Sequence, residues 1–228
     1  MSLTKTENLI VRLFRRKKKI DNDPRPYVSK GMSLDEFARV YDLTFQYRQR
    51  VLPEAFTLEF WEKSHAVRLP LERGLLRNDI LDVGCGSGEI DIIFGMKGYT
   101  VCGLDISPYA IEIANRHLKK YPELSEKVRF VNGNIEEIDL TDRFNTAMIY
   151  HTLEHVMDPH RTLDHTIRFL NPGAKILLEV PYKKAYRDRT HLRRFSPGKL
   201  KKLLSAFSNK VEVIHFKERR TIFAVVDV

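Results

Sequence analysis

The sequence lacks the features that mark secreted, membrane-spanning and repetitive proteins. It has only two cysteines, Cys85 and Cys102, which are too few for a disulfide framework and lack the paired spacing of a structural zinc site. No run approaches the roughly 18 apolar residues that a spanning helix needs, and the N-terminus has no apolar run of the signal-peptide kind. We therefore expect reduced thiols in a soluble, cytoplasmic protein.

What the sequence does contain is typical of a globular chain. It has 228 residues, of which 43% are hydrophobic and 30% charged, and these values exclude disorder throughout. At roughly 100–200 residues per domain, the length predicts one large domain, alone or with a small appendage.

The formal net charge of +9 is concentrated at the two ends of the chain. Residues 1–30 carry +6 and residues 182–220 carry +10, whereas residues 31–181 carry −6. A basic excess suggests an anionic partner, and its distribution assigns that contact to the terminal segments.

Changes in composition divide the chain into three parts. Residues 1–30 form a basic appendage, in which LIVRLFRRKKK precedes a segment with two prolines. Residues 31–77 form an N-terminal helical cap, whose first helix begins at the S-x-x-E capping box of Ser33 and ends before Pro53. Two shorter helices are expected near 56–65 and 68–76. The main domain then occupies residues 78–228.

In the main domain, short apolar strands alternate with amphipathic helices. This pattern predicts an α/β fold with a doubly wound, mostly parallel sheet of seven strands. The last two strands, VEVIHF and TIFAVVDV, are expected to form an antiparallel pair at the sheet edge. The other expected strands are 79–83, 100–105, 128–132, 145–150 and 174–180, and the expected helices are 88–97, 108–120, 153–170 and 197–207.

The strongest chemical signal is a glycine-rich turn after the first strand, ILDVGCGSGEI. Glycines allow the backbone to pass close to a ligand that a Cβ would exclude. The spacing is G-x-G-x-G, with Glu89 where a dinucleotide fingerprint has its last glycine. An acid at that point disfavours a pyrophosphate, so the turn suits a nucleoside without phosphates.

A second signal lies at the end of the next strand, where Asp105 follows Gly88 by 17 residues. A carboxylate at this place can accept hydrogen bonds from both hydroxyls of a ribose. The two signals together, in this order and spacing, predict a nucleoside-binding site.

These motifs give the stretch from Asp79 to about Phe207 a clear resemblance to the class I S-adenosylmethionine-dependent methyltransferases, in particular the UbiG-like small-molecule group. LDVGCGSG resembles the first motif of that family, GNIEEI the motif at the adenine edge, MIYHTLEHV the segment after the fourth strand, and HLRRFSPGKLKKLL a late segment. The resemblance implies a Rossmann-like fold with S-adenosylmethionine as cofactor. It implies cofactor contacts by Asp82, Gly84, Cys85, Gly86, Gly88, Asp105, Ile106, Asn134, Ile135 and Tyr150.

The chain departs from the family pattern in two respects. Asn134 stands where the family usually has Asp, although its amide oxygen still accepts a bond from the adenine amino group. The first seventy residues carry no motif that can be assigned to this family, and part of the choice of substrate is expected to reside there.

The methyl group of a sulfonium is already activated, so the protein chiefly has to align the reactants. A hydroxyl acceptor also needs a base or a metal ion. His151, Glu154 and His155 follow the fourth strand as H-x-x-E-H, which places them on one face if the segment is helical. His191, in the loop after the fifth strand, is expected to approach from across the cleft.

Three interpretations of these residues stay open. In some relatives an E-x-x-E-H segment with a later acid or histidine holds a divalent metal, and a set of His151, Glu154, His155 and His191 favours Zn, Fe or Mn over Mg. Alternatively, one histidine acts alone as general base. The first candidates are His155 and His191, and the next is His151. In the third interpretation the segment only begins a helix beside the cofactor. The remaining histidines, His65, His117, His160, His165 and His215, are interpreted as surface or packing residues.

The acceptor is expected to meet aromatic and basic side chains. Tyr41, Phe45, Tyr47 and Trp61 can form an aromatic lid, because ring faces attract sulfonium ions and flat substrates, although such spacing also fits a helix core. After the fifth strand Tyr182, Lys183, Lys184, Arg187, Arg189, Arg193 and Arg194 border the expected acceptor pocket and suit an anionic group on the substrate. A solvated loop is the other interpretation of these charges.

The sequence therefore predicts methyl transfer from S-adenosylmethionine to an oxygen or nitrogen of a small molecule. The first alternative is an RNA methyltransferase that uses the basic N-terminus and the segment 183–202, although no RNA-binding module or N-P-P-Y tetrapeptide is present. The N-terminal charges also suit weak contact with an anionic membrane surface. Further alternatives are a nucleoside-binding protein without activity and a nicotinamide-dependent enzyme.

Overall fold

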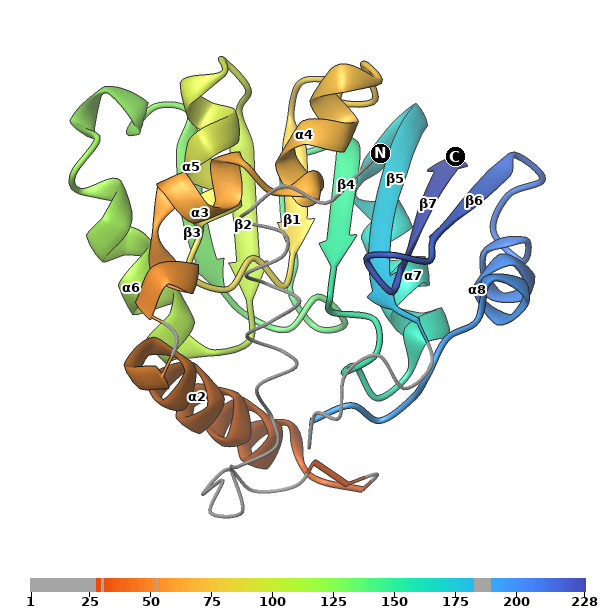
Figure 1. The fold of residues 1–228 in the computed structure, drawn as a ribbon, viewed down its shortest axis with the longest axis horizontal. Helices are drawn as coiled ribbons and strands as arrows, with labels where there is room; N and C mark the ends of the chain where they lie inside the picture. Colours follow the sequence, from red (N-terminus) through yellow and green to blue (C-terminus); the bar gives the residue numbers. More distant parts are fainter. Residues whose placement is uncertain (1–27, 30, 52, 183–189) are drawn as a thin grey trace.

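The computed structural model describes residues 28–29, 31–51, 53–182 and 190–228. The described chain builds one seven-stranded sheet with the strand order β3-β2-β1-β4-β5-β7-β6 (Figure 1). Only β7 runs antiparallel to its neighbours β5 and β6, which confirms the predicted sheet and its antiparallel edge. The strands are β1 (Ile80–Val83), β2 (Val101–Asp105), β3 (Val128–Asn132), β4 (Phe144–Tyr150), β5 (Leu170–Pro181), β6 (Val211–Phe216) and β7 (Thr221–Asp227).

Helices cover both faces of this sheet. Side chains of α4 and α5 pack with one face of the sheet, and side chains of α7 and α8 pack with the other. All residues of β1 and β2 are buried, as expected for parallel strands covered on both sides. The helices are α2 (Leu34–Val51), η2 (Pro53–Phe56), α3 (Leu58–Glu62), α4 (His65–Glu72), α5 (Glu89–Met96), α6 (Pro108–Leu118), η3 (Pro122–Leu124), α7 (Pro159–Arg168) and α8 (Pro197–Leu204).

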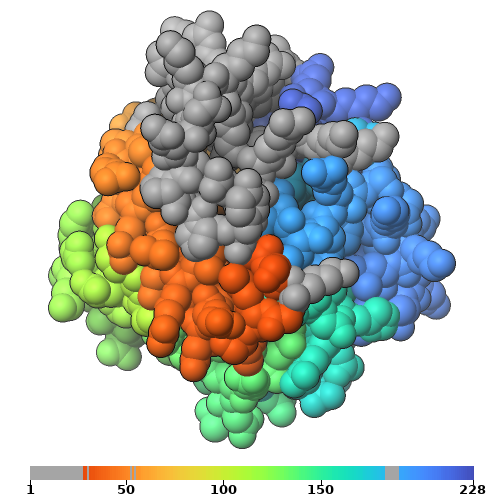
Figure 2. All heavy atoms as spheres, turned by 90° about the horizontal axis from the view of Figure 1, so that it is seen from below, coloured from red at the N-terminus to blue at the C-terminus, as the bar shows by residue number. Residues whose placement is uncertain are grey.

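Helix α2 lies across the carboxyl ends of the parallel strands. Its N-terminus forms the predicted capping box, in which the backbone N–H of Ser33 donates to Glu36 at 2.8 Å and the N–H of Glu36 donates to the hydroxyl of Ser33 at 3.3 Å. Seen from this edge, α2 crosses the molecule between the green segments on one side and the teal and blue segments on the other (Figure 2). Ligands of open α/β sheets bind at this edge, so α2 roofs the expected site.

The helix predicted over 153–170 begins later than expected. Asp158 is the N-cap of α7, its carboxylate accepts hydrogen bonds from the N–H groups of His160 and Arg161, and Pro159 occupies the first helical position. The preceding residues form turns. The prediction that His151, Glu154 and His155 share a helix face is therefore wrong, and a turn brings them together instead.

The fifth strand is longer than predicted. The predicted strand starts at residue 174, but β5 already begins at Leu170 and includes Asn171, Pro172 and Gly173. The pairing with β4 shifts here, because Phe144 faces Leu170 while Thr146 faces Lys175. The proline and glycine are accommodated at this irregularity rather than in a loop.

The helical cap differs from its prediction in detail. The expected helix near 56–65 is represented by η2 and α3, and the one expected near 68–76 is α4, which begins at His65. The basic segment 1–27 lies outside the described residues, and the proposed domain boundaries stay a prediction. None of the described helices combines the length and the apolar character needed to cross a bilayer.

Candidate functional site

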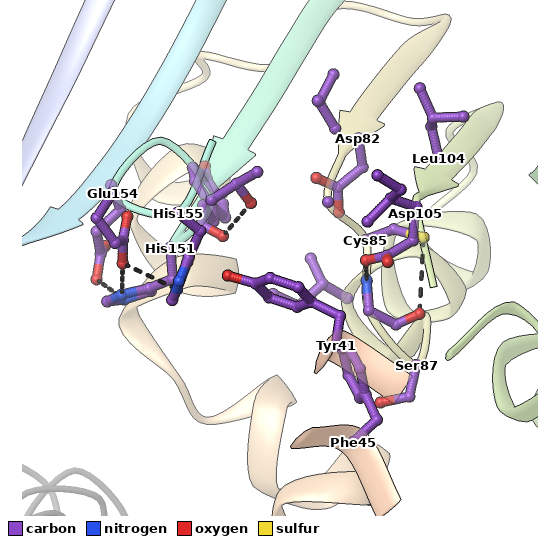
Figure 3. A pocket seen from close by; sticks show the side chains of 18 of the residues that line it. Tyr41, Phe45, Asp82, Cys85, Ser87, Leu104, Asp105, His151, Glu154 and His155 are labelled. Atoms are coloured by element: carbon purple, nitrogen blue, oxygen red, sulfur yellow. Dashed lines mark hydrogen bonds and ion pairs between the residues drawn. The ribbon is translucent and has the colours of Figure 1, made fainter. Parts of the chain in front are cut away.

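A cavity of about 380 Å³ lies between α2 and the carboxyl edge of the sheet. This volume is within the range of small-molecule sites. Its walls come from the turn after β1, the ends of β2 and β4, the loop after β3, and helices α2 and α3. Figure 3 shows Tyr41 of α2 between two groups of side chains, one around Asp82 and Asp105 and the other around Glu154 and His155.

The glycine turn forms one end of the cavity. Gly84, Gly86 and Gly88 all have positive φ values, of 83°, 58° and 77°, which other residues adopt only with strain. Gly86 lies under the ring of Phe45, whose nearest atom would be 3.2 Å from a Cβ at this position. The turn therefore presents bare backbone to the cavity.

The predicted ligand contact of Gly88 is not supported by its position. Gly88 is absent from the cavity wall, and a Cβ there would lie 2.4 Å from the ring of Phe130. Its role is to let α5 pack closely against β3. Gly84 and Cys85 line the cavity as predicted.

Asp105 lies at the end of β2, and its side chain is buried. One carboxylate oxygen accepts a hydrogen bond of 2.9 Å from the N–H of Gly86, and the other accepts one of 2.8 Å from the N–H of Ser107. Each carboxylate oxygen has two acceptor sites, so these bonds orient the group and leave capacity for a ligand. Burial raises the pKa of Asp105 to about 6, against the opposing effect of the two backbone bonds.

The neighbouring acids are carboxyls whose pKa values are raised by burial and by one another. Burial and the charge of Asp105 raise the pKa of Asp82 to about 7. Asp91 lies behind it, fully buried, and burial together with the charge of Asp82 raises its pKa well above the ordinary value. Buried carboxylates of this kind are stabilised by a cation, so the electrostatics favour a positively charged ligand.

The loop after β3 supplies an apolar and amide-bearing wall. Asn134 and Ile135 of this loop line the cavity, as predicted, together with Ile106, which directly follows β2. The amide oxygen of Asn134 accepts a hydrogen bond of 3.1 Å from the N–H of Glu136, which holds the side chain in an Asx turn. A second lone pair on this oxygen keeps the acceptor capacity that an adenine amino group requires.

The opposite end of the cavity gathers three histidines around one carboxylate. The distances from Glu154 Oε1 are 3.6 Å to His151 Nδ1, 3.7 Å to His155 Nε2 and 3.9 Å to His191 Nε2. Glu154 is only 1% exposed. Burial alone raises its pKa, but the contact with His151 and the imidazole charges outweigh burial, and the pKa lies below its ordinary value.

His155 has a defined orientation. Its Nδ1 lies 3.0 Å from the backbone oxygen of Thr190, and since a carbonyl oxygen only accepts, Nδ1 carries the proton. When the ring is neutral, its lone pair is on Nε2, which lies 3.7 Å from Glu154 Oε1. This arrangement suits a general base or a metal ligand.

His151 differs from the other two histidines. It has a positive φ of 52° although it is not glycine, and its Nε2 lies 3.3 Å from Glu179 Oε1. Burial lowers its pKa, but the contacts with Glu154 and Glu179 raise it to about 10. At neutral pH this imidazole is charged, so it does not accept a proton.

Glu179 is a buried acid at the cavity that the sequence analysis did not single out. It is buried in β5 between His151 and His65, and its second oxygen lies 3.5 Å from His65 Nδ1. The available signal was an acid in the middle of the apolar strand ILLEVP. His65, interpreted from sequence as a packing residue, also lines the cavity.

The residues predicted to hold a metal fit such an ion in part. One ligand atom each from Glu154, His155 and His191 lie within 4.8 Å of one another. Neither oxygen of Glu154 accepts a hydrogen bond within the described residues. A buried carboxylate and two imidazoles suit a divalent transition metal, whereas the fourth predicted ligand, His151, is engaged as a cation.

The predicted aromatic lid is largely present. Of the predicted residues, Tyr41, Phe45 and Trp61 line the cavity, and Phe37 and Phe60 join them. Tyr47 does not line it, because it lies on another face of α2, where Arg50 approaches its ring at 5.8 Å. Tyr182 also lies outside the cavity wall and packs its ring 4.1 Å from that of His215.

The basic residues that line the cavity differ from those predicted to contact the acceptor. Arg193 donates to the backbone oxygens of Leu153, Val156 and Met157, so it stabilises the turn before α7. Lys183, Lys184, Arg187 and Arg189 lie outside the described residues. Two arginines that were not predicted, Arg48 and Arg219, line the cavity.

Comparison with known proteins identifies a matching family and several similar chains. A family model described as a methyltransferase domain matches residues 45–221. The chain is similar to the mitochondrial ubiquinone biosynthesis O-methyltransferase of Schizosaccharomyces pombe, with 31% identity over 101 residues, 44% of this chain and 37% of that protein. A ubiquinone biosynthesis O-methyltransferase of Alkalilimnicola ehrlichii is 32% identical over 109 residues, 47% of this chain and 43% of that protein.

The matched segments thus span less than half the length of these curated relatives. Among solved structures, the complex of DhpI with SAH has a TM-score of 0.67 at 18% identity and covers 87% of this chain and 97% of that chain. At this identity the likeness shows the fold.

Proposed function

Because the chain belongs to the methyltransferase-domain family and uses S-adenosylmethionine as its cofactor, we propose that it methylates a hydroxyl group on a small aromatic acceptor. The observation that carries this proposal is the composition of one cavity. It joins the glycine turn and Asp105 at one end to His155 and Glu154 at the other (Figure 3).

The cofactor occupies the end formed by the glycine turn in this proposal. Asp105 accepts hydrogen bonds from the ribose hydroxyls, and Ile106, Asn134 and Ile135 border the adenine. The glycine turn, with Asp82 and Cys85 beside it, borders the methionine part. The buried acids favour the positive sulfonium over a neutral ligand.

His155 acts as the general base. As the acceptor oxygen attacks the methyl carbon, its proton passes to His155 Nε2 and the electrons of the carbon–sulfur bond stay on sulfur. The products are a methyl ether, neutral S-adenosylhomocysteine (SAH) and an imidazolium. The ionised Glu154, whose oxygen lies 3.7 Å from Nε2, stabilises that imidazolium.

The acceptor lies between Tyr41 and the other aromatic rings of the roof. Flat rings pack well against aromatic walls, and the similar proteins from S. pombe and A. ehrlichii are O-methyltransferases of ubiquinone biosynthesis. Both points support a phenol as acceptor. A cavity roofed by α2 also favours a small molecule over the alternative RNA acceptor.

A divalent metal at Glu154, His155 and His191 is a second candidate, because one ligand atom of each residue lies within 4.8 Å of the others. Such an ion would lower the proton affinity of an acceptor hydroxyl. Metal analysis of the purified protein, with activity before and after chelation, distinguishes the two candidates. Full activity without metal supports His155 as base.

The proposal is tested by incubating the protein with methyl-labelled S-adenosylmethionine and separate sets of phenols, aromatic amines and bulk RNA. We expect label in a phenol product, with an equal amount of SAH released. Transfer only to amines or RNA would contradict the proposal. Binding of SAH without any transfer would favour the inactive nucleoside-binding alternative, and stabilisation by NAD rather than SAH would favour the nicotinamide alternative.

A further inference from the structure

The turn 152–157, which carries Glu154 and His155, forms few hydrogen bonds of its own. Within it, the backbone N–H groups of His155 and Val156 donate to the backbone oxygen of Thr152, at 2.9 Å and 3.3 Å. Backbone groups that are withdrawn from water need partners, and a segment without regular structure must find them on other elements. The conformation of this turn therefore depends on what surrounds it.

The side chain of Arg193 supplies three of these partners from across the chain. Its Nη1 donates to the backbone oxygen of Leu153 at 2.9 Å and to that of Val156, and its Nη2 donates to that of Met157 at 2.8 Å. A guanidinium presents its donors in a rigid, planar fork. One side chain thus fixes the relative positions of three carbonyl groups of the turn.

The backbone beside Arg193 binds the same turn. The N–H groups of Leu192 and Arg193 donate to the backbone oxygen of Glu154, at 3.0 Å and 3.3 Å. The backbone oxygen of the buried Thr190 accepts the Nδ1 proton of His155 at 3.0 Å. The segment 190–193 therefore contacts Glu154 through its main chain and His155 through its ring.

This segment is also anchored at places away from the turn. Phe195 is 6% exposed and belongs to the main hydrophobic core. It forms a parallel bridge with Tyr182, which directly follows β5. The next residue, Ser196, is the N-cap of α8, and its hydroxyl accepts a hydrogen bond of 3.3 Å from the N–H of Lys199. The segment can thus act as a fixed support for the turn.

Arg193 acts from behind the cavity wall. Glu154, His155, Val156 and Met157 line the cavity, whereas Arg193 does not. Its guanidinium therefore holds residues of the wall without facing the ligands. Burial lowers the pKa of Arg193, but an arginine stays charged at neutral pH, so all of its donors remain in place.

We propose that Arg193 is a positioning residue for methyl transfer, which holds Glu154 and His155 in their places opposite the cofactor end of the cavity. This inference rests on the proposed function, because it takes His155 as the base. The rate of a transfer between aligned groups depends steeply on their geometry, and a displacement of about 1 Å can lower it about 10²-fold. The effect of Arg193 should therefore appear in the chemical step.

The test replaces Arg193 by lysine in the full chain. Lysine keeps the positive charge but has no planar fork, so it does not span the three carbonyl groups. With methyl-labelled S-adenosylmethionine and a set of phenols, we expect kcat to fall by about 10²-fold in Arg193→Lys, while the affinity for SAH stays within about two-fold. NMR of the histidine ring nitrogens, in the SAH complex, should show that His155 loses its fixed Nδ1-protonated form.

The matched control is Arg194→Lys, which makes the same change at the next residue, where the side chain is exposed. It should leave kcat, the affinity for SAH and the signals of His155 unchanged. The variant His155→Gln identifies those signals by their loss. If Arg193→Lys does not fold, Arg193→Gln takes its place with the same expected direction, because its amide keeps two N–H donors but reaches fewer of the carbonyl groups.

The outcomes separate this inference from the proposed function. A kcat of Arg193→Lys within about two-fold of the parent value, or unchanged signals of His155, would overturn the positioning role. Equal losses of kcat and of SAH affinity would also overturn it, since they indicate a general loss of structure. If the parent protein methylates none of the phenols, the proposed function fails instead, and the signals of His155 alone then decide whether Arg193 holds this ring.

Discussion

The carboxylate of Asp42, on α2, accepts a hydrogen bond of 2.5 Å from the hydroxyl of Ser107, the N-cap of α6. The backbone N–H of Ser107 in turn donates to Asp105 at 2.8 Å. A second bond joins the same two helices, because the hydroxyl of Tyr109 donates to Gln49 at 2.8 Å. The roof of the cavity is thus tied directly to the carboxylate proposed to bind the ribose.

Replacing Asp42 by alanine should loosen this connection. We expect SAH to dissociate about five- to ten-fold faster from Asp42→Ala, since Tyr41 and Phe45 then cover the cavity less firmly and Ser107 loses its partner. Asp42→Asn keeps an acceptor oxygen, so its rate of SAH dissociation should lie between the rates of Asp42→Ala and the parent protein. Stopped-flow measurement of SAH release checks this.

The matched control is Asp35→Ala, which removes an exposed aspartate from the first turn of the same helix. It should release SAH at the parent rate. Equal rates for Asp42→Ala and the parent would show that the contact between α2 and α6 does not hold the roof over the cofactor.

The affinity for S-adenosylmethionine should rise with pH between 5.5 and 7.5. The pKa values of Asp105 and Asp82 are raised to about 6 and about 7, so these carboxyls are neutral at the lower pH and become charged as the pH rises. A charged carboxylate attracts the sulfonium, and we expect an increase on the order of ten-fold. Calorimetric titration across this range measures it.

SAH provides the control for this pH dependence, because it has the same amino acid part but no sulfonium charge. Its affinity should change less over the same range, and Asp82→Asn should flatten the curve for S-adenosylmethionine. Parallel curves for both ligands would contradict the electrostatic role of the two acids.

Gly88 should matter for stability through packing. Gly88→Ala places a methyl group 2.4 Å from Phe130 at a positive φ, and we expect a loss of about 2–4 kcal/mol in the free energy of unfolding. Gly98→Ala separates the two causes, since Gly98 also has a positive φ but no atom within 4 Å of the added carbon. It should cost only about 1 kcal/mol. If urea denaturation showed similar losses in the free energy of unfolding for the two variants, packing against Phe130 would not explain the effect at Gly88.

His155 should affect the chemical step more than cofactor binding. In His155→Gln we expect kcat to fall by about 10²–10³ while the affinity for SAH stays within about two-fold, because the base is lost and the cofactor end of the cavity is unchanged. His165→Gln, in α7, replaces a histidine outside the cavity wall and serves as control. A loss of SAH affinity equal to the loss of kcat would point to a packing role for His155.

The periodic parts of the sequence predicted the fold well. The buried strand ILDV and the capping box at Ser33 are examples. Each is specified by residues that are neighbours in the sequence, so its structure can be predicted from them. The helix expected at 153 was misplaced because the hydrophobic pattern outweighed the capping signal of Asp158 and Pro159. Tertiary packing likewise absorbed Pro172 and Gly173 into β5.

The cofactor end was more predictable than the acceptor end. Asp82 and Asp105 lie on two adjacent strands and Gly86 lies in the turn after the first of them, so their motif specifies their position. Glu179 and His65 come from separate elements and meet only through the fold, so spacing along the chain does not reveal them. For the same reason, the sequence did not reveal the contacts of Arg193. It lies in the segment expected to border the acceptor pocket, but it binds backbone oxygens instead of facing the cavity.

Calorimetric titration of SAH into the parent protein and into Asp105→Ala tests whether this cavity binds the cofactor. We expect one site per chain in the parent and a loss of at least about ten-fold in affinity in Asp105→Ala, whereas Asp139→Ala, at an exposed position, should leave the affinity unchanged. A parent that binds no SAH, or a variant that binds it as tightly as the parent, would contradict the assignment of this cavity to the cofactor.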